Sequence, residues 1–194
     1  PQGVRVALEN GVDSIEHGAK PDEETIRLFK EKNAFQISTI SPALPYALFD
    51  RSISHATYEQ QENGKVVFDG IVSLAKACLE TGVPVGLGTD TGCPYITHYD
   101  MWRELCYFVK YCGVTPAFAL YSATLLNAKL AKIDSFTGSV EKGKCADIIV
   151  CAKNPLEDLS ALRSLDMVIK EGYIIENPHP KKMPECEKEL DKFL

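Results

Sequence analysis

The chain has 194 residues, a formal net charge of −6, and 45% hydrophobic and 25% charged residues, a composition typical of an ordinary globular protein. The acidic balance excludes the basic surface that nucleic-acid binding requires, and no apolar run approaches the about 18 residues of a transmembrane helix. The seven cysteines form no C-x-x-C pair, so we expect buried thiols in a reducing cytoplasm and no cysteine zinc site.

Strands and helices are predicted to alternate over about the first 130 residues, which indicates a parallel sheet with helical crossovers. The predicted order is a helix over 2–10, a strand ending at His17, a helix from Pro21, a strand over 34–39, an irregular segment over 41–64, a helix over 65–81, a strand over 85–88, a helix over 97–112, and helices over 116–123 and 125–131. The irregular segment follows a strand, so it is expected to form a lid or substrate wall, with an ordinary surface excursion as the alternative.

The pattern changes after Ile133. Short strands are predicted over 136–140, 146–151, 166–170 and 173–176, and Glu171-Gly172 is a turn that joins the last two as a hairpin. From residue 177 the chain is broken by proline and then charged, which predicts a tail with one short helix.

A carboxylate follows the predicted strand over 85–88. The stretch VGLGTDTG alternates apolar residues with glycine and then places Asp90 before a turn. A polar side chain at the C-terminal end of a buried strand is the usual place for chemistry in α/β folds. The alternative is a capping or turn aspartate that opens the next loop.

A histidine occupies the matching place on an earlier strand. In GVDSIEHG, His17 ends an apolar strand and precedes a glycine. Histidine and aspartate are both ligands of zinc and related metals, although a single strand-end histidine can equally be a hydrogen-bonded structural residue. Two such strand ends favour a shared site, and Cys93, close after Asp90, is a candidate for lining it.

Four motifs in order resemble one family. GVDSIEHG and GLGTDTG are followed by GSVEKGKCADIIV and NPLEDLSALRSLDMVIKEGYII, and this run resembles the C-terminal part of a metal-dependent amidohydrolase. The branch it is most similar to contains Xaa-Pro dipeptidases and imidazolonepropionase-related enzymes. The resemblance covers the chain from Gly3 to about Ile175.

The resemblance implies an α/β fold, namely the C-terminal portion of a TIM-like (β/α)8 metallo-dependent hydrolase barrel followed by part of a small β-sandwich. By their order, the three predicted strands of the first part correspond to barrel strands six to eight. The expected domains are a partial barrel over 1–132, a composite β-sandwich over 133–176 and a tail over 177–194.

The resemblance also implies residue roles. His17 matches a metal ligand at the end of the sixth strand, and Asp90 matches the aspartate after the eighth, which is both metal ligand and general base. His98 resembles a substrate-contacting histidine of this branch, with a plain helix-start residue as the alternative. The implied cofactor is a divalent metal, most simply zinc, with one or two ions in the intact parent protein, and the implied substrate is a small or dipeptide-like molecule.

Other ligands of the family have no counterpart in this sequence: an H-x-H pair on the first strand, a carboxylated lysine on the fourth and a histidine on the fifth. We therefore expect the chain to continue a longer protein and the isolated chain to be inactive. The parent is expected to hydrolyse an amide or peptide-like C–N bond, as a dipeptidase or prolidase does, with a metal-activated water. Open strand edges would also favour self-association into a homo-oligomer.

Other functions stay open, both within and outside catalysis. Within the same superfamily, the alternative is a cyclic amidohydrolase or a deaminase. Outside catalysis, the alternative is a binding module that uses the same pocket without hydrolysis, or an interaction fragment that associates through its sheet edge.

Overall fold

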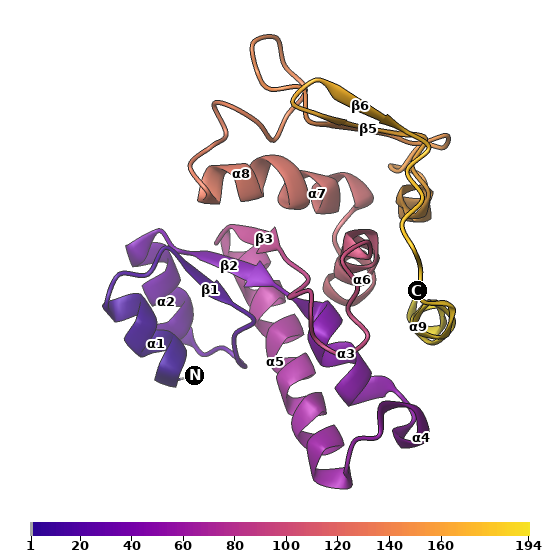
Figure 1. The fold of residues 1–194 in the computed structure, drawn as a ribbon. Helices are drawn as coiled ribbons and strands as arrows, with labels where there is room; N and C mark the ends of the chain where they lie inside the picture. Colours follow the sequence, from indigo (N-terminus) through magenta and orange to yellow (C-terminus); the bar gives the residue numbers. More distant parts are fainter. Residues whose placement is uncertain (1) are drawn as a thin grey trace. The chain divides into compact units, whose positions relative to one another are not determined.

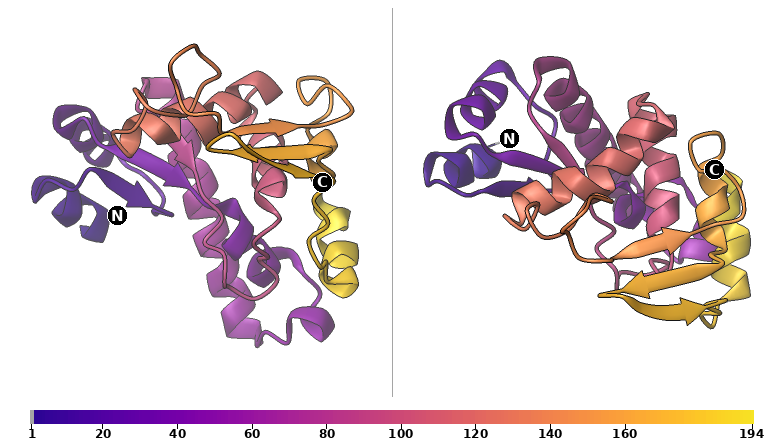
Figure 2. Two further views of the ribbon diagram at one scale, coloured as in Figure 1. Left: turned by 45° about the horizontal axis from the view of Figure 1, so that its top comes forward. Right: turned by 90° about the horizontal axis from the view of Figure 1, so that it is seen from above.

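The computed structural model describes residues 2–194, and the chain divides into two compact units, one ending at His98 and one running from Tyr99 to Leu194. Figure 1 labels the helices and strands of both units, and Figure 2 shows the same ribbon in two further views. The predicted domain boundary at residue 132 stays a prediction. Among the described residues, none of the helices has the length and apolar character needed to cross a bilayer.

The first unit contains a parallel three-stranded sheet with β2 in the middle. The strands are β1 (Ser14–Glu16), β2 (Phe35–Ser38) and β3 (Val85–Leu87), in the order β1-β2-β3. Gln36 pairs with Ile15 on one side and with Val85 on the other. Because paired residues of parallel strands point to the same face, these three buried side chains share one face of the sheet. The carboxyl ends of all three strands meet at one edge.

Helices connect and cover these strands. They are α1 (Gln2–Glu9), α2 (Glu23–Lys32), α3 (Ile40–Leu48), α4 (Arg51–Ser54) and α5 (Tyr58–Thr81). α2 begins at Asp22, whose carboxylate accepts the backbone N–H of Thr25, and it ends at Asn33 in the left-handed conformation, so both ends carry the expected caps. α5 packs against β2 and β3 (Figure 1).

The prediction of an irregular segment over 41–64 is wrong, because the structure forms α3, α4 and the first turns of α5 there. Pro42 falls in the first turn of α3, where its missing N–H costs no helical hydrogen bond. α5 starts earlier than residue 65 because Thr57 and Gln60 form a capping box. α3 is then held by packing: an added Cβ at Gly64 would lie 2.9 Å from backbone and side-chain atoms of Tyr46. The prolines in this segment make α3 hard to predict from the sequence, whereas close packing against α5 stabilises it.

The second unit is helical at its start and at its end. Its helices are α6 (Met101–Cys112), α7 (Pro116–Tyr121), a π-helical turn η1 (Ser122–Leu126), α8 (Asn127–Leu130), short 3-10 turns η2 (Leu159–Arg163) and η3 (Asp191–Phe193), and α9 (Pro184–Leu190). α6 begins four residues later than predicted, and the two helices predicted over 116–131 follow one another without a break. The short helix predicted in the tail is confirmed as α9.

An antiparallel sheet fills the middle of the second unit. Its strands are β4 (Ile148–Val150), β5 (Met167–Lys170) and β6 (Tyr173–Glu176), in the order β4-β5-β6. The predicted hairpin is confirmed: Lys170 pairs with Tyr173, and both turn residues between them have positive φ, 51° and 83°, as a type I′ turn requires. The strand predicted over 136–140 is wrong, since turns and bends occupy that segment. Gly138 there has φ +91°, which no strand residue adopts.

A buried arginine fastens the tail within the second unit. Arg103 on α6 is 1% exposed and forms ion pairs with Asp100 (3.3 Å), Glu187 (3.2 Å) and Asp191 (2.6 Å). Arg163 reaches Glu187 at 2.7 Å and Asp191 at 2.9 Å. This arginine cluster therefore joins α6, η2, α9 and η3 by charge-assisted hydrogen bonds.

Candidate active site

Two strand-end side chains meet at the carboxyl edge of the parallel sheet. His17 follows β1 directly, and Asp90 lies shortly after β3. His17 Nε2 and Asp90 Oδ2 are 3.8 Å apart, and the two side chains are 44% and 49% exposed. Both residues have left-handed backbones, with φ of 59° and 50°, a conformation that costs non-glycine residues energy and is often found at functional sites. The structure brings together the two residues that the sequence singled out.

Hydrogen bonds from β2 and from Thr39, the residue after it, hold His17 at three points. Its backbone N–H donates to the carbonyl of Ile37 (3.1 Å), and its own carbonyl accepts from Gln36 Nε2 (3.2 Å). Its ring Nδ1 is bonded to the hydroxyl of Thr39. The imidazole is therefore anchored through Nδ1, and Nε2 is left facing Asp90.

Asp90 lies in a tight turn with Cys93. The Cys93 thiol donates to Asp90 Oδ2 at 3.5 Å. Burial, and then the hydrogen bond and charge of Asp90, raise the pKa of the Cys93 thiol. Since the thiolate is the reactive form, Cys93 is poorly suited to be a nucleophile. It lines the pocket beside Asp90, as its place in the sequence suggested.

A pocket of about 400 Å³ opens next to the pair. One side is formed by His17, Asp90 and Cys93, and the other by residues of α3 and α5: Pro42, Ala43, Tyr46, Gln60, Asn63, Gly64, Val67 and Ile71. The segment expected to form a lid or substrate wall therefore does line the pocket, although as two helices. Its surface is mostly apolar, with two amides, Gln60 and Asn63, on the side of α5.

His98 does not join the pair in lining this pocket. It is exposed and sits in a turn at the end of the first unit. Its role in contacting substrate stays a prediction.

The donor atoms of the pair suit a metal in part. A neutral imidazole Nε2 and a carboxylate oxygen are both good ligands of divalent metals, and these two atoms lie 3.8 Å apart. A catalytic zinc site normally has three protein ligands. Over residues 2–194 no group of three or more His, Cys, Asp or Glu side chains is placed to hold a metal ion. The pair fits as one part of a metal site, with further ligands required.

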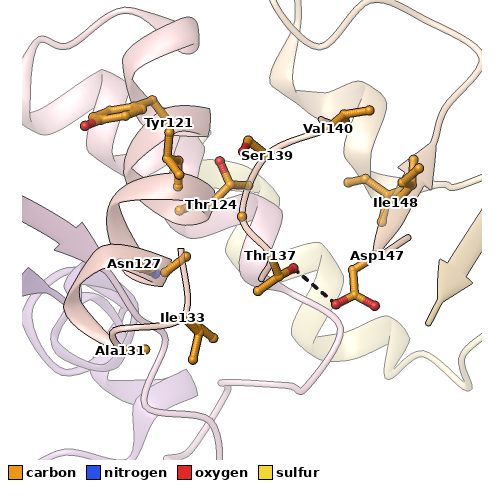
Figure 3. Close-up of a pocket in the computed structure, with 15 residues that line it drawn as sticks. Tyr121, Thr124, Asn127, Ala131, Ile133, Thr137, Ser139, Val140, Asp147 and Ile148 are labelled. Atoms are coloured by element: carbon orange, nitrogen blue, oxygen red, sulfur yellow. Dashed lines mark hydrogen bonds between the residues drawn. The ribbon is translucent and has the colours of Figure 1, made fainter. Parts of the chain in front are cut away.

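A second, larger pocket of about 760 Å³ lies in the second unit, between the helical run 116–130 and the segment that leads into β4 (Figure 3). Its main charged lining residue is Asp147, whose carboxylate bonds Thr137 (3.2 Å), Lys170 (3.0 Å) and the backbone N–H of Glu171 (2.9 Å). That N–H, and then Lys170, lower the pKa of Asp147. Its carboxylate is already engaged on both oxygens, so Asp147 serves the local fold.

Sequence reasoning missed Thr39 and Gln36 as site residues. The available signal was position: Thr39 ends the predicted strand between the two that carry His17 and Asp90. A polar residue at the end of the central strand of a parallel sheet must lie near the ends of its neighbours.

Comparisons with known proteins bear on the family and the fold of the chain. A sequence model of the amidohydrolase family matches residues 3–175. A crystal structure from Bifidobacterium longum, of a protein designated a prolidase, is 41% identical with a TM-score of 0.96, covering 99% of this chain and 49% of that one. A Xaa-Pro dipeptidase with methionine bound in its active site is 35% identical with a TM-score of 0.81, covering 90% of this chain and 42% of that one.

Among curated proteins, the imidazolonepropionase of Geobacillus thermodenitrificans (strain NG80-2) is 25% identical over 181 residues, which is 90% of this chain and 37% of the relative. The chain thus spans about half or less of the length of each of these three proteins.

Proposed function

The chain belongs to the amidohydrolase family, and from that premise we propose that it forms part of a metal-dependent hydrolase that cleaves an amide or peptide-like C–N bond. The observation that carries the proposal is the pairing of His17 Nε2 with Asp90 Oδ2 at 3.8 Å, at the carboxyl edge of a parallel sheet and beside a mostly apolar pocket. Active sites of barrel enzymes lie at this edge.

In this proposal His17 and Asp90 hold a divalent metal, most simply zinc, together with ligands from outside residues 2–194. Such an ion supplies Lewis-acid chemistry, since it lowers the pKa of water and polarises the carbonyl under attack. Asp90, half exposed in the pocket, takes the proton of the attacking water and passes it to the leaving nitrogen. His98 contacts the substrate.

We also propose that β1, β2 and β3 are strands six to eight of a (β/α)8 barrel and that β4 to β6 belong to a small β-sandwich. The parallel order β1-β2-β3 supports this assignment, as does the TM-score of 0.96 to a structure about twice as long. Two ligands alone cannot complete the site, so the 194-residue chain by itself is inactive.

The proposed substrate is a dipeptide-like molecule with an apolar side chain. Of the two structural relatives named above, one carries the designation prolidase and the other is a Xaa-Pro dipeptidase with methionine bound in its active site. The apolar lining by α3 and α5 suits such a side chain. The second candidate is hydrolysis of a cyclic amide, which the likeness to imidazolonepropionase favours.

Zinc binding to the purified chain, measured by isothermal titration calorimetry and elemental mass spectrometry, tests the site. We expect weak binding that is lost in His17→Ala and in Asp90→Asn and is unchanged in His179→Ala, which removes a histidine of the second unit. Absence of binding, or binding that survives both site variants, would contradict the assignment.

Hydrolysis of Met-Pro and of a cyclic amide by the parent enzyme then separates the two candidate reactions. Turnover of Met-Pro that depends on Asp90 supports the dipeptidase, and turnover of the cyclic amide alone supports the second candidate.

A further inference from the structure

Thr39 occupies a helix-capping position but does not cap. It is the residue before α3, yet its side chain makes no hydrogen bond to the first turn of that helix. Thr57 before α5 and Thr115 before α7 occupy the same position and each accept a backbone N–H, from Gln60 and Phe118 respectively. Because capping is the usual role of threonine at this position, another contact must account for the side-chain conformation of Thr39.

That contact is with His17. The Thr39 hydroxyl is bonded to Nδ1 of the His17 ring, and Thr39 is 3% exposed whereas the His17 side chain is 44% exposed. On its other side, the Thr39 methyl lies 3.5 Å from where a Cβ at Gly88 would be. A buried residue, packed against the turn that leads to Asp90, thus holds one end of a solvent-accessible ring.

We propose that Thr39 is a positioning residue for His17, whose hydroxyl fixes the imidazole so that Nε2 faces Asp90. The backbone of His17 is already tied to β2 through Ile37 and Gln36. Those bonds leave rotation of the ring about its side-chain torsions free, and the bond to Thr39 removes that freedom.

A hydroxyl is well suited to this task because it can both donate and accept a hydrogen bond. When the imidazole proton is on Nε2, the Thr39 hydroxyl donates to Nδ1. When Nε2 binds a cation, the proton must be on Nδ1. The Thr39 hydroxyl then rotates about its C–O bond, and its oxygen accepts a hydrogen bond from the Nδ1–H group. The ring keeps one orientation in both states. The claim that Nε2 binds a metal ion rests on the proposed function, whereas the orientation of the ring by Thr39 does not.

The test compares Thr39→Val, which keeps the shape and removes the hydroxyl, with Thr39→Ser, which keeps the hydroxyl. Long-range ¹H–¹⁵N correlation spectra of the unloaded 194-residue chain report the ring nitrogens of its four histidines. We expect the His17 nitrogens to move toward the values of a free imidazole in Thr39→Val and to stay at wild-type values in Thr39→Ser. Thr57→Val, which removes a genuine cap in the same unit, should lower the melting temperature more than Thr39→Val and leave the His17 nitrogens unmoved.

Unchanged His17 nitrogens in a folded Thr39→Val chain would overturn the proposal, as would equal shifts in Thr57→Val. Titration with zinc alone adds a second readout: loss of an outer hydrogen bond to a ligand histidine typically weakens metal binding about 10- to 100-fold, and Thr39→Ser should restore it. If the wild-type chain binds no zinc, the metal site fails, while the nitrogen spectra still decide the role of Thr39.

Discussion

Each of the two units brings together charged or polar side chains from distant parts of the chain. The two groups differ in how far their side chains are buried and paired. In the second unit Arg103 is 1% exposed and meets three carboxylates. In the first unit His17 and Asp90 are each nearly half exposed and stand 3.8 Å apart. The arginine cluster is a closed arrangement, and the His17–Asp90 pair is an open one.

The difference follows from what each arrangement must do. A charge taken out of water must be paired and hydrogen-bonded, since an unpaired buried charge costs several kcal/mol. The arginine cluster pairs its buried charges internally and so serves the fold. The His17–Asp90 pair keeps coordinating atoms accessible, as binding chemistry requires. Both residues have a left-handed backbone conformation, which is energetically unfavourable for residues other than glycine.

The largest effect is expected at the arginine cluster. Arg103→Met should lower the free energy of unfolding of the second unit by about 3–5 kcal/mol, because it removes the buried cation of Asp100 and leaves Glu187 and Asp191 with Arg163 alone. Trp102 is the only tryptophan, and its ring lies 4.5 Å from the Arg103 guanidinium carbon. Urea denaturation followed by tryptophan fluorescence therefore reports this unit directly.

The matched control is Arg27→Met on α2, which breaks exposed ion pairs to Glu24 and Glu31. It should change stability little, because exposed pairs contribute little. Similar losses in both variants would mean that burial does not distinguish the cluster.

Backbone strain next to the open pair gives the second effect. Gly18 follows His17 with φ +101°, and an added Cβ would clash with Cδ2 of the buried Leu74. Gly18→Ala should destabilise the first unit by about 2 kcal/mol, measured by thermal unfolding with circular dichroism. Gly3→Ala in α1, where the new Cβ meets nothing within 4 Å, should instead stabilise slightly. A neutral Gly18→Ala would show that the His17 turn is not constrained.

Acid should loosen the arginine cluster. Burial alone would raise the pKa of Asp191, but hydrogen bonds from Arg103 and Arg163 outweigh it, so the pKa is lowered. A carboxyl with a lowered folded pKa stabilises fully above its unfolded value of about 3.9, and that contribution is lost as the pH falls through the folded pKa. The melting temperature, followed by Trp102 fluorescence, should therefore decrease when the pH is lowered below about 4.

Asp191→Asn removes that titrating group. It should lower the melting temperature at pH 7 and flatten the acid dependence. If the melting temperature of Asp191→Asn decreased as steeply at low pH as that of the wild type, other carboxylates would be responsible for the effect.

The smallest effect is expected at the open pair itself. Asp90→Asn should leave the free energy of unfolding within about 0.5 kcal/mol, because Asp90 is exposed and asparagine tolerates the left-handed backbone well. The same variant should abolish zinc binding. A large loss of stability in thermal unfolding would indicate that Asp90 serves the fold, as the capping alternative holds.

Several elements could be predicted from local patterns. The strand ends at His17 and Asp90, the helix that begins at Thr115 and Pro116, and the turn at Glu171 and Gly172 all depend on signals within a few residues. The segment over 41–64 could not, because its prolines indicate irregular chain, whereas the packing of α3 on α5 makes it helical. The strand predicted over 136–140 failed for a related reason, since Gly138 lies against Ala128 and Leu125, a contact no short window contains.

The sequence by itself determined the alternation of strands and helices, the family, and the two strand-end residues His17 and Asp90, because parallel strands bring their carboxyl ends to one edge wherever they pair. Only the tertiary structure decided that Thr39 turns from capping to the His17 ring and that Arg103 gathers carboxylates from the tail. These contacts join residues far apart in the chain, and the free energy of such contacts depends on burial and distance in three dimensions.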